Sequence, residues 1–117
     1  MTERAIKRLS FNPGSLLKTE ADVMKYCRLH LKSRGWFVVR HQQNIGSYPG
    51  ISDYSAHKNG LTVWVECKSP KWKPKPEDSK SKTERAQDKF EADIIAHGGL
   101  YVRVQSVEQI EEIGRME

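Results

Sequence analysis

The sequence has 117 residues, a formal net charge of +5 at pH 7, and 37% hydrophobic against 30% charged residues. This length suits a single domain and leaves too little chain for two, while three Trp, four Tyr and three Phe argue against a disordered chain. No apolar run approaches the roughly 20 residues that cross a bilayer, no secretory signal is visible, and two cysteines are too few for a disulfide framework. We therefore expect a cytoplasmic protein with no membrane partner.

The first predicted helix is bounded by clear signals at both ends. Residues 1–18 mix basic and small side chains and are interpreted as an N-terminal arm. Thr19 and Asp22 have the spacing of a capping box, which predicts that a helix begins there. Apolar residues then recur at helical spacing until Gly35, where we expect the helix to end.

Three predicted strands follow this helix. Aromatic and β-branched residues are frequent in residues 36–42, 51–57 and 61–68, a composition typical of strands. The last two segments are separated by Asn59-Gly60, a strong signal for a two-residue hairpin turn. We expect the three strands to pair as an antiparallel meander.

The second half of the chain begins with a basic loop over residues 69–82, whose prolines prevent continuous regular structure. Ser81 and Glu84 form a second capping box, residues 100–104 predict a fourth strand, and residues 105–117 predict a C-terminal helix. The element order predicts an α/β fold in one domain of residues 1–117. The second helix has an apolar stripe formed by Ala86, Phe90, Ile94 and Ile95.

Two carboxylates and a lysine are predicted to meet beside the hairpin. Glu66 and Lys68 share one strand face because strand side chains alternate, and the Asn59-Gly60 turn pairs residue 53 with residues 66 and 67. Asp53 and Glu66 would repel each other unless a cation lies between them. Oxygen ligands without a Cys or His cluster favour Mg²⁺ or Mn²⁺. The alternative is a surface salt bridge between Glu66 and Lys68, with Asp53 as a turn residue.

Two further polar residues could join this group. Glu20 lies in line with the apolar face of the first helix, so it is expected to point toward the sheet, although an acid there could instead complement the helix dipole. Gln87 borders the apolar stripe of the second helix. Taken alone, it could be an ordinary solvated glutamine.

In this order, Gly50-Ile51-Ser52-Asp53, Glu66-Cys67-Lys68 and Gln87 resemble the PD-(D/E)xK nuclease signature. With Glu20, the set resembles the VRR-NUC branch, the virus-type replication-repair nucleases, in the stand-alone form of phages and bacteria. The resemblance covers residues 19–104, and Ser52 departs from the proline often found before the aspartate. It implies a restriction-endonuclease-like α-β-β-β-α-β core with a C-terminal helix, in the cytoplasm of a bacterial or phage-infected cell.

The resemblance also implies roles for these residues. Asp53, Glu66 and the backbone carbonyl of Cys67 would hold Mg²⁺ or Mn²⁺, and Glu20 would bind a metal directly or through water. The metal would act as a Lewis acid and activate a water molecule. Lys68 would orient or deprotonate that water or neutralise the transition state, and Gln87 would position Lys68 or a phosphate oxygen.

Residues around this predicted site suit a DNA partner, because Lys and Arg bind phosphates without reading sequence. Trp72 could stack on an unpaired base. The alternative for residues 69–82 is a solvated linker with a stray aromatic residue. The predicted DNA-binding residues are Arg40, His41, Gln43, Asn44, Lys71, Trp72, Lys73 and Lys75.

These expectations combine into a metal-dependent, structure-specific DNA endonuclease. Stand-alone members of the resembled branch look like Holliday-junction resolvases. Symmetric cutting of a four-way junction needs two active sites, so we expect a homodimer that binds branched DNA. A flap or single-strand nuclease, and a catalytically inert nucleic-acid-binding module of the same fold, are the alternatives.

Overall fold

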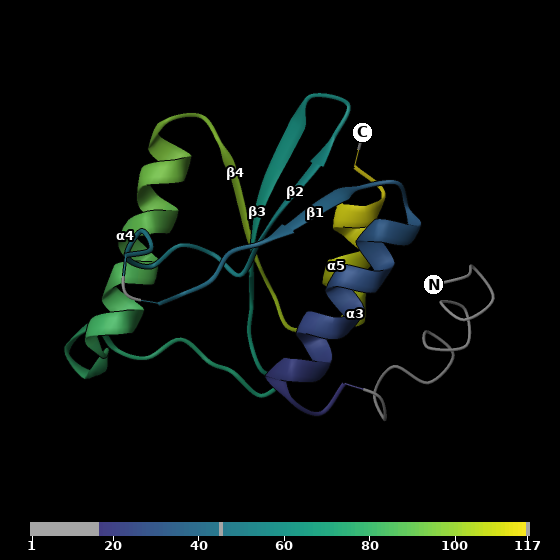
Figure 1. Cartoon of the computed structure of the whole chain (residues 1–117). Coiled ribbons are helices and arrows are strands. Elements are labelled where there is room, and N and C mark those ends of the chain that lie inside the picture. Colours follow the sequence, from purple (N-terminus) through teal and green to yellow (C-terminus); the bar gives the residue numbers. More distant parts are fainter. Residues whose placement is uncertain (1–16, 45, 117) are drawn as a thin grey trace.

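The computed structural model describes residues 17–44 and 46–116, which form a four-stranded mixed sheet with helices on both faces (Figure 1). The predicted arm over residues 1–18 therefore lies almost wholly outside the described residues. In the part of the chain that is described, no helix is long and apolar enough to cross a membrane.

The helices and strands follow one another in the predicted order. Both capping boxes are confirmed: the Thr19 side chain accepts from the backbone N–H of Asp22, and the Ser81 side chain accepts from that of Glu84. The elements are α3 (Glu20–Ser33), β1 (Phe37–Arg40), β2 (Tyr54–Lys58), β3 (Leu61–Cys67), the 3₁₀ turn η1 (Glu77–Ser79), α4 (Lys82–Ala96), β4 (Leu100–Val104) and α5 (Val107–Gly114).

The sheet has the strand order β1-β2-β3-β4. The first three strands form the predicted antiparallel meander, and β4 pairs in parallel with β3 at the other edge. The chain reaches this parallel strand through α4, which lies on one face of the sheet, whereas α3 and α5 lie side by side on the opposite face (Figure 1).

The hairpin between β2 and β3 has the predicted two-residue turn. Asn59 and Gly60 have φ values of 51° and 82°, and positive values at both positions are typical of a type I′ turn. Two of the predicted strands are shorter than expected: β2 begins at Tyr54, not at residue 51, and β1 spans only Phe37–Arg40. One cross-strand hydrogen bond follows β1, from the backbone N–H of His41 to the Asp53 carbonyl; beyond it the loop has local turns, in which Ser47 N–H donates to the Asn44 carbonyl and Ile51 N–H to the Tyr48 carbonyl.

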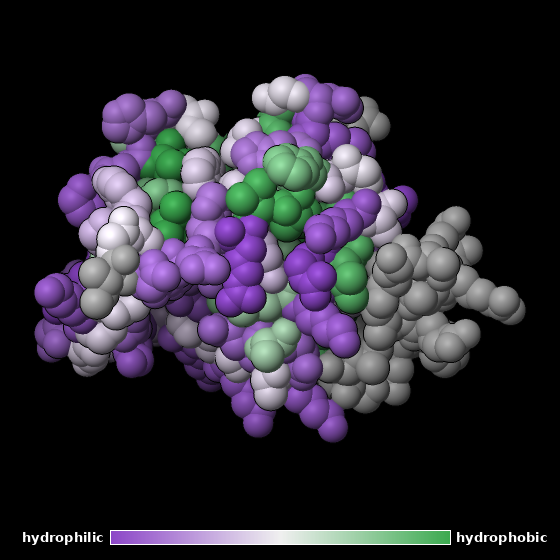
Figure 2. All heavy atoms as spheres, in the orientation of Figure 1, coloured by the Kyte–Doolittle hydropathy of each residue, from purple (hydrophilic) through white to green (hydrophobic). Residues whose placement is uncertain are grey.

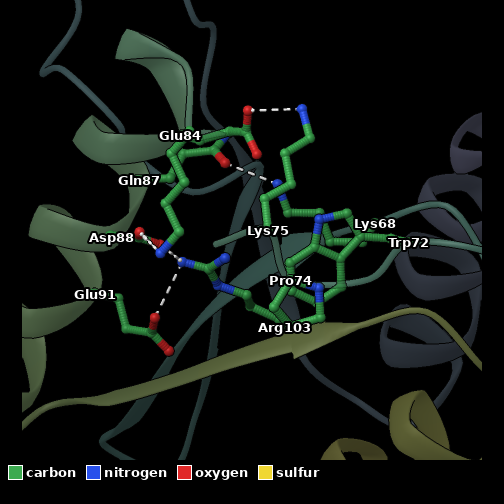
Figure 3. Close-up of a pocket in the computed structure, with 10 residues that line it drawn as sticks. Lys68, Trp72, Pro74, Lys75, Glu84, Gln87, Asp88, Glu91 and Arg103 are labelled. Atoms are coloured by element: carbon green, nitrogen blue, oxygen red, sulfur yellow. Dashed lines mark hydrogen bonds and ion pairs between the residues drawn. The ribbon is translucent and has the colours of Figure 1, made fainter. Parts of the chain in front are cut away.

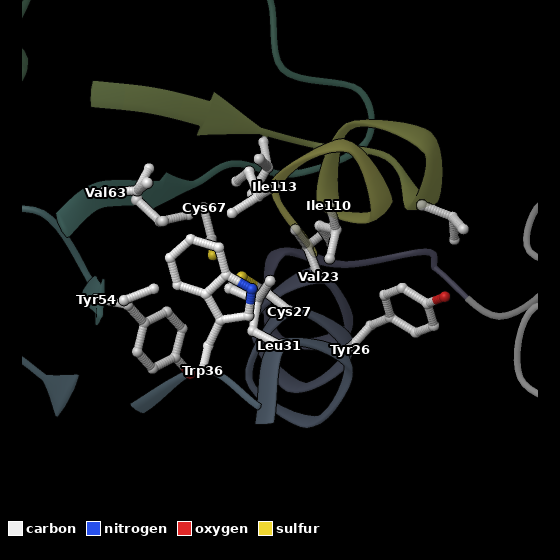
Figure 4. Close-up of a cluster of buried hydrophobic side chains, with 14 residues drawn as sticks. Val23, Tyr26, Cys27, Leu31, Trp36, Tyr54, Val63, Cys67, Ile110 and Ile113 are labelled. Carbon is white, nitrogen blue, oxygen red and sulfur yellow. The ribbon is translucent and has the colours of Figure 1, made fainter. Parts of the chain in front are cut away.

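The hydrophobic core lies between the sheet and the pair α3 and α5 (Figure 4). Val63, Val65 and Cys67 of β3 face this layer and are at most 1% exposed, as the alternation of the strand predicts. On α5 the three predicted apolar residues are buried as well. The members of the core that belong to β3 and α5 are Val63, Val65, Cys67, Val107, Ile110 and Ile113.

The opposite face is only partly covered, because α4 lies over the β3 and β4 side of the sheet (Figure 1). Phe90 of α4 is buried, and its ring contacts Trp64 of β3 and Tyr101 of β4 with centroids 5.5 and 6.1 Å apart. Ile95 is 56% exposed, so its predicted place in the buried stripe of α4 is wrong. The stripe is narrower than the sequence suggests because the helix contacts one part of the sheet.

A histidine is buried between α3 and α5 without a hydrogen bond. Among the described residues neither ring nitrogen of His30 has a partner, and the ring stacks on Tyr26 with centroids 5.5 Å apart. Burial lowers the pKa of His30, although Glu111 opposes this and Arg34 and Arg115 add to it. Protonation therefore favours the unfolded chain, whose His pKa is about 6.5, and this contribution to stability is lost as the pH falls below that value.

We expect His30→Leu to reduce the loss of stability between about pH 7 and pH 5 by on the order of 1 kcal/mol relative to the wild type. Urea unfolding of both proteins at the two pH values measures this difference. All other titrating groups are common to the two proteins, so the comparison isolates His30. An identical pH dependence would contradict the assignment.

Candidate functional site

The register of the hairpin places Asp53 beside Glu66. Tyr54 is paired with Val65, so the residue before β2 lies opposite the next residue of β3. The backbone N–H of Asp53 donates to Oε1 of Glu66 at 3.1 Å, which joins the two residues directly. The predicted adjacency of the two acids is confirmed.

The Asp53 carboxylate is held by two donors. Its Oδ2 accepts from the backbone N–H of Cys67 at 2.8 Å, and its Oδ1 accepts from Nε2 of Gln43 at 3.2 Å. Gln43 also donates to the carbonyl of Ile51 at 2.9 Å, which connects the start of the loop to its end. A carboxylate has about four acceptor positions, so each oxygen keeps a lone pair for another ligand.

Glu66 is a buried acid beside another acid. It is only 2% exposed. Burial, together with the negative charge of Asp53, raises the pKa of Glu66 to about 8, and the nearby Lys68 partly opposes this. A group whose charge is this strongly disfavoured is typical of functional sites, although structural ion-pair networks also produce such shifts.

Lys68 follows β3 and points to the same face as Glu66. Its Nζ donates to Oε1 of Gln87 at 2.7 Å and lies 3.5 Å from Oε2 of Glu66. The Trp72 ring covers the ammonium, with its centroid 5.6 Å from Nζ. Gln87 is buried on α4, so the solvated alternative for this residue is wrong. The predicted meeting of Glu66, Lys68 and Gln87 is confirmed.

Gly50 explains how the loop before Asp53 reaches α4. It has φ +75°, and a side-chain carbon at this position would overlap the backbone carbonyl of Ala86 and lie 2.7 Å from the backbone nitrogen of Gln87. Only glycine allows both this conformation and this approach. The loop that carries Asp53 is thus packed directly against the turn of α4 that carries Gln87.

Glu20 does not join this group. It is exposed at the first residue of α3, so the prediction that it points toward the sheet is wrong. The reason is its place in the first helical turn, where an acid complements the helix dipole while remaining in solvent. Within residues 17–44 and 46–116, no three or more His, Cys, Asp or Glu side chains are grouped so that they could hold a metal ion.

The predicted DNA-binding residues are distributed unevenly around the carboxylates. Gln43 contacts Asp53, and the backbone N–H of His41 donates to the Asp53 carbonyl at 2.9 Å. Arg40 is exposed at the end of β1, and Asn44 donates to Gln42 at 3.3 Å; neither contacts a carboxylate of the described site.

The basic loop over residues 69–82 is fastened to α4 by ion pairs. Lys75 lies 3.2 Å from Glu84, and Lys80 lies 2.6 Å from Asp88. Lys71 and Lys73 are exposed and have no ion pair with any described residue. Lys75 is therefore partly neutralised, which the sequence did not indicate, because its partner is on a helix that follows the loop.

A cavity of about 260 Å³ lies between this loop and α4, next to Lys68 (Figure 3). Arg103 of β4 points into it and donates to Asp88 at 2.8 Å and to Glu91 at 3.0 Å. Its guanidinium lies 5.7 Å from the Trp72 ring centroid. The register pairs Arg103 with Glu66. Arg103 was not predicted from the sequence; the available signal was its place on the same strand face as Tyr101, between the apolar residues Val102 and Val104.

The Cys67 thiol belongs to the core and not to the site. It is 1% exposed, and contact with Cys27 together with burial raises the pKa of the Cys67 thiol. Only the backbone of Cys67 faces Asp53.

Comparisons with protein-family models, with curated proteins and with solved structures gave no match. Any function must therefore be argued from the geometry of Asp53, Glu66, Lys68 and Gln87.

We expect Gly50→Ala to destabilise the protein by about 3 kcal/mol or more, because the new methyl group overlaps α4 and the backbone is strained. Gly98→Ala is the matched control, since Gly98 has φ +81° and nothing within 4 Å of its added carbon. That variant should lose only about 1–2 kcal/mol from backbone strain. Urea unfolding measures both, and equal losses would show that the close approach is unimportant.

Proposed function

We propose that the chain is a divalent-metal-dependent nuclease that hydrolyses phosphodiester bonds of DNA, a stand-alone VRR-NUC member of the PD-(D/E)xK superfamily. The observation that carries the proposal is the convergence of Asp53, Glu66, Lys68 and Gln87 at one end of a hairpin. The α-β-β-β-α-β order of the described elements supports the restriction-endonuclease-like topology.

The donor set fits a hard cation. Mg²⁺ keeps several waters and is typically held by one or two carboxylates together with substrate phosphates, so Asp53 and Glu66 suffice without a third acid. The raised pKa of Glu66 also favours a bound cation, because a cation between the two carboxylates would offset their repulsion. The backbone carbonyl of Cys67 is the further candidate ligand.

When bound, the cation would polarise the scissile phosphate and lower the pKa of a bound water. The chain's own residues would orient the reactants. Lys68 has three N–H donors, of which Gln87 and Glu66 engage two, so the third can be directed to a phosphate oxygen or to water. Trp72 and Gln87 both contact the ammonium group of the lysine and would restrict its motion.

A DNA partner is supported by the charge of the chain and by the position of its basic loop. The net charge is +5, and residues 69–82 leave β3 directly after Lys68. The preferred substrate in this proposal is a four-way junction. One chain supplies one set of Asp53, Glu66 and Lys68, so symmetric cutting requires a homodimer.

We expect Asp53→Asn and Lys68→Met each to lower metal-dependent cleavage at least about 100-fold, since each removes a group that acts on the reacting phosphate. The assay compares a four-way junction, a flap, a single strand and a linear duplex in Mg²⁺ and in Mn²⁺. Glu112→Gln and Lys32→Met are the controls, because both residues are exposed and belong to α5 and α3, which lie on the face of the sheet opposite α4.

The outcomes distinguish the alternatives. Cleavage of the flap or single strand alone would favour the corresponding nuclease over a junction resolvase. Tight binding of branched DNA without cleavage in either metal would favour an inert binding module. This outcome is tested because no third acid is grouped with Asp53 and Glu66 among the described residues.

We expect Lys71→Ala combined with Lys73→Ala to weaken DNA binding and to reduce its salt dependence. The slope of log affinity against log salt concentration becomes shallower by roughly 0.9 for each duplex phosphate that loses its lysine contact. Lys75→Ala should have a smaller effect because Lys75 is paired with Glu84. Titrations at several salt concentrations measure the slopes. An unchanged slope in the double variant would place the loop away from DNA.

A further inference from the structure

One half of the α4-facing side of the sheet has no helix over it. The helix α4 lies beside β3 and β4, whereas β1 and β2 extend beyond it (Figure 1). In the space-filling view, hydrophobic residues gather around a hollow between the part of the surface that contains α4 and the part that contains the hairpin (Figure 2). Among the side chains on this face, Phe37 is exposed and His57 and Trp64 are partly exposed, whereas Ser55 is buried.

Two large aromatic residues are exposed at this face. Phe37 of β1 is 69% exposed, and Tyr48 of the loop before Asp53 is 58% exposed. Exposing large apolar rings costs free energy, so such rings commonly mark binding surfaces. Phe37 is paired with His57 at the start of the edge strand β1, whereas Tyr48 belongs to the loop that carries Asp53 and its ring contacts Phe90 of α4.

The two exposed rings belong to two series of ring contacts on this face, which together we call the aromatic track. It contains Phe37, His57, His41, Trp64, Phe90 and Tyr48. Phe37 contacts His57 at 5.9 Å, and His41 stacks on Trp64 at 5.4 Å. Trp64 contacts Phe90 at 5.5 Å, and Phe90 contacts Tyr48 at 5.7 Å.

Hydrogen bonds connect the two histidines of the track. Ser55 Oγ lies 2.9 Å from Nε2 of His41 and 2.9 Å from Nε2 of His57, and Nδ1 of His57 lies 2.9 Å from Thr62 Oγ1. Nδ1 of His41 has no hydrogen bond to any described residue. The track thus combines flat apolar surfaces with a polar ring atom that is available to a ligand.

We propose that the aromatic track binds the unpaired bases of a single nucleic-acid strand and leads that strand to Asp53 and Glu66. The proposal rests on the proposed function for the kind of ligand, but it does not need cleavage. Bases stack on aromatic side chains regardless of sequence, and each stack contributes measurably to affinity. His41 links the track to the backbone of Asp53, because the backbone N–H of His41 donates to the Asp53 carbonyl.

The arrangement favours single strands over the other occupants. In a duplex the base faces are already stacked on one another, so Phe37 and Tyr48 would find none free. A nucleic-acid strand also brings negative charge to a chain whose net charge is +5. The strand is therefore the occupant that suits both the rings and the charge.

The test is binding of a fluorescently labelled oligothymidylate in EDTA, followed by anisotropy. Phe37→Ala and Tyr48→Ala should each weaken binding about fivefold or more, which corresponds to the loss of one stacked base. Ile95→Ala is the matched control, because Ile95 is 56% exposed but lies near the C-terminal end of α4. It should bind like the wild type.

An abasic oligonucleotide of the same length separates base stacking from attraction to the backbone. The wild type should bind it more weakly than the thymidylate, and Phe37→Ala and Tyr48→Ala should cause no further loss. Wild-type affinity of both variants for the thymidylate, or equal losses on the abasic strand, would overturn the proposal. So would a dimer in sedimentation equilibrium that Phe37→Ala dissociates, because the face would then be occupied by a second copy.

Failure of this proposal and failure of the proposed function give different results. If the track does not bind bases, thymidylate affinity is insensitive to Phe37 and Tyr48 while Asp53→Asn still abolishes cleavage of duplex or branched DNA. If the chain is not a nuclease, no substrate is cut in Mg²⁺ or Mn²⁺ while the ring variants still weaken binding of the thymidylate.

Discussion

The pairing of β2 with β3 is the constraint on which the site depends. A two-residue turn at Asn59 and Gly60 fixes the register, and that register places Asp53 beside Glu66. Because strand side chains alternate, a shift of one residue would turn Glu66 into the core and bring Val65 to the α4-facing side. Two carboxylates that repel each other are therefore held together by backbone hydrogen bonds distributed along a whole hairpin.

The second half of the site depends on a separate contact between the loop and α4. Lys68 directly follows β3, and its Nζ donates to Gln87 of α4, the helix against which Gly50 packs. The parallel pairing of β4 with β3 returns the chain so that Arg103 lies beside Glu66. The position of Lys68 therefore depends both on the register of the hairpin and on the packing of α4.

Much of this arrangement could be predicted because its signals are local. Capping boxes, an Asn-Gly turn and strict alternation over 63–67 each depend on a few neighbouring residues. The errors concern groups whose surroundings are set by distant elements. Glu20 follows the apolar line of its helix yet lies in solvent, and Ile95 belongs to a stripe wider than the surface it covers. The ion pair between Lys75 and Glu84 was not predicted either, because it depends on how the loop packs against α4.

Because Cys67 and Cys27 are buried, their reaction with an alkylating reagent reports when the sheet separates from α3. Both thiols are at most 1% exposed, and the pKa of Cys67 is raised, so neither is reactive while the sheet is closed against α3. An alkylating reagent can reach Cys67 only when β3 separates from that helix, which also displaces Glu66 and Lys68. The rate of alkylation therefore measures how often the strand that carries the two charged side chains leaves its place.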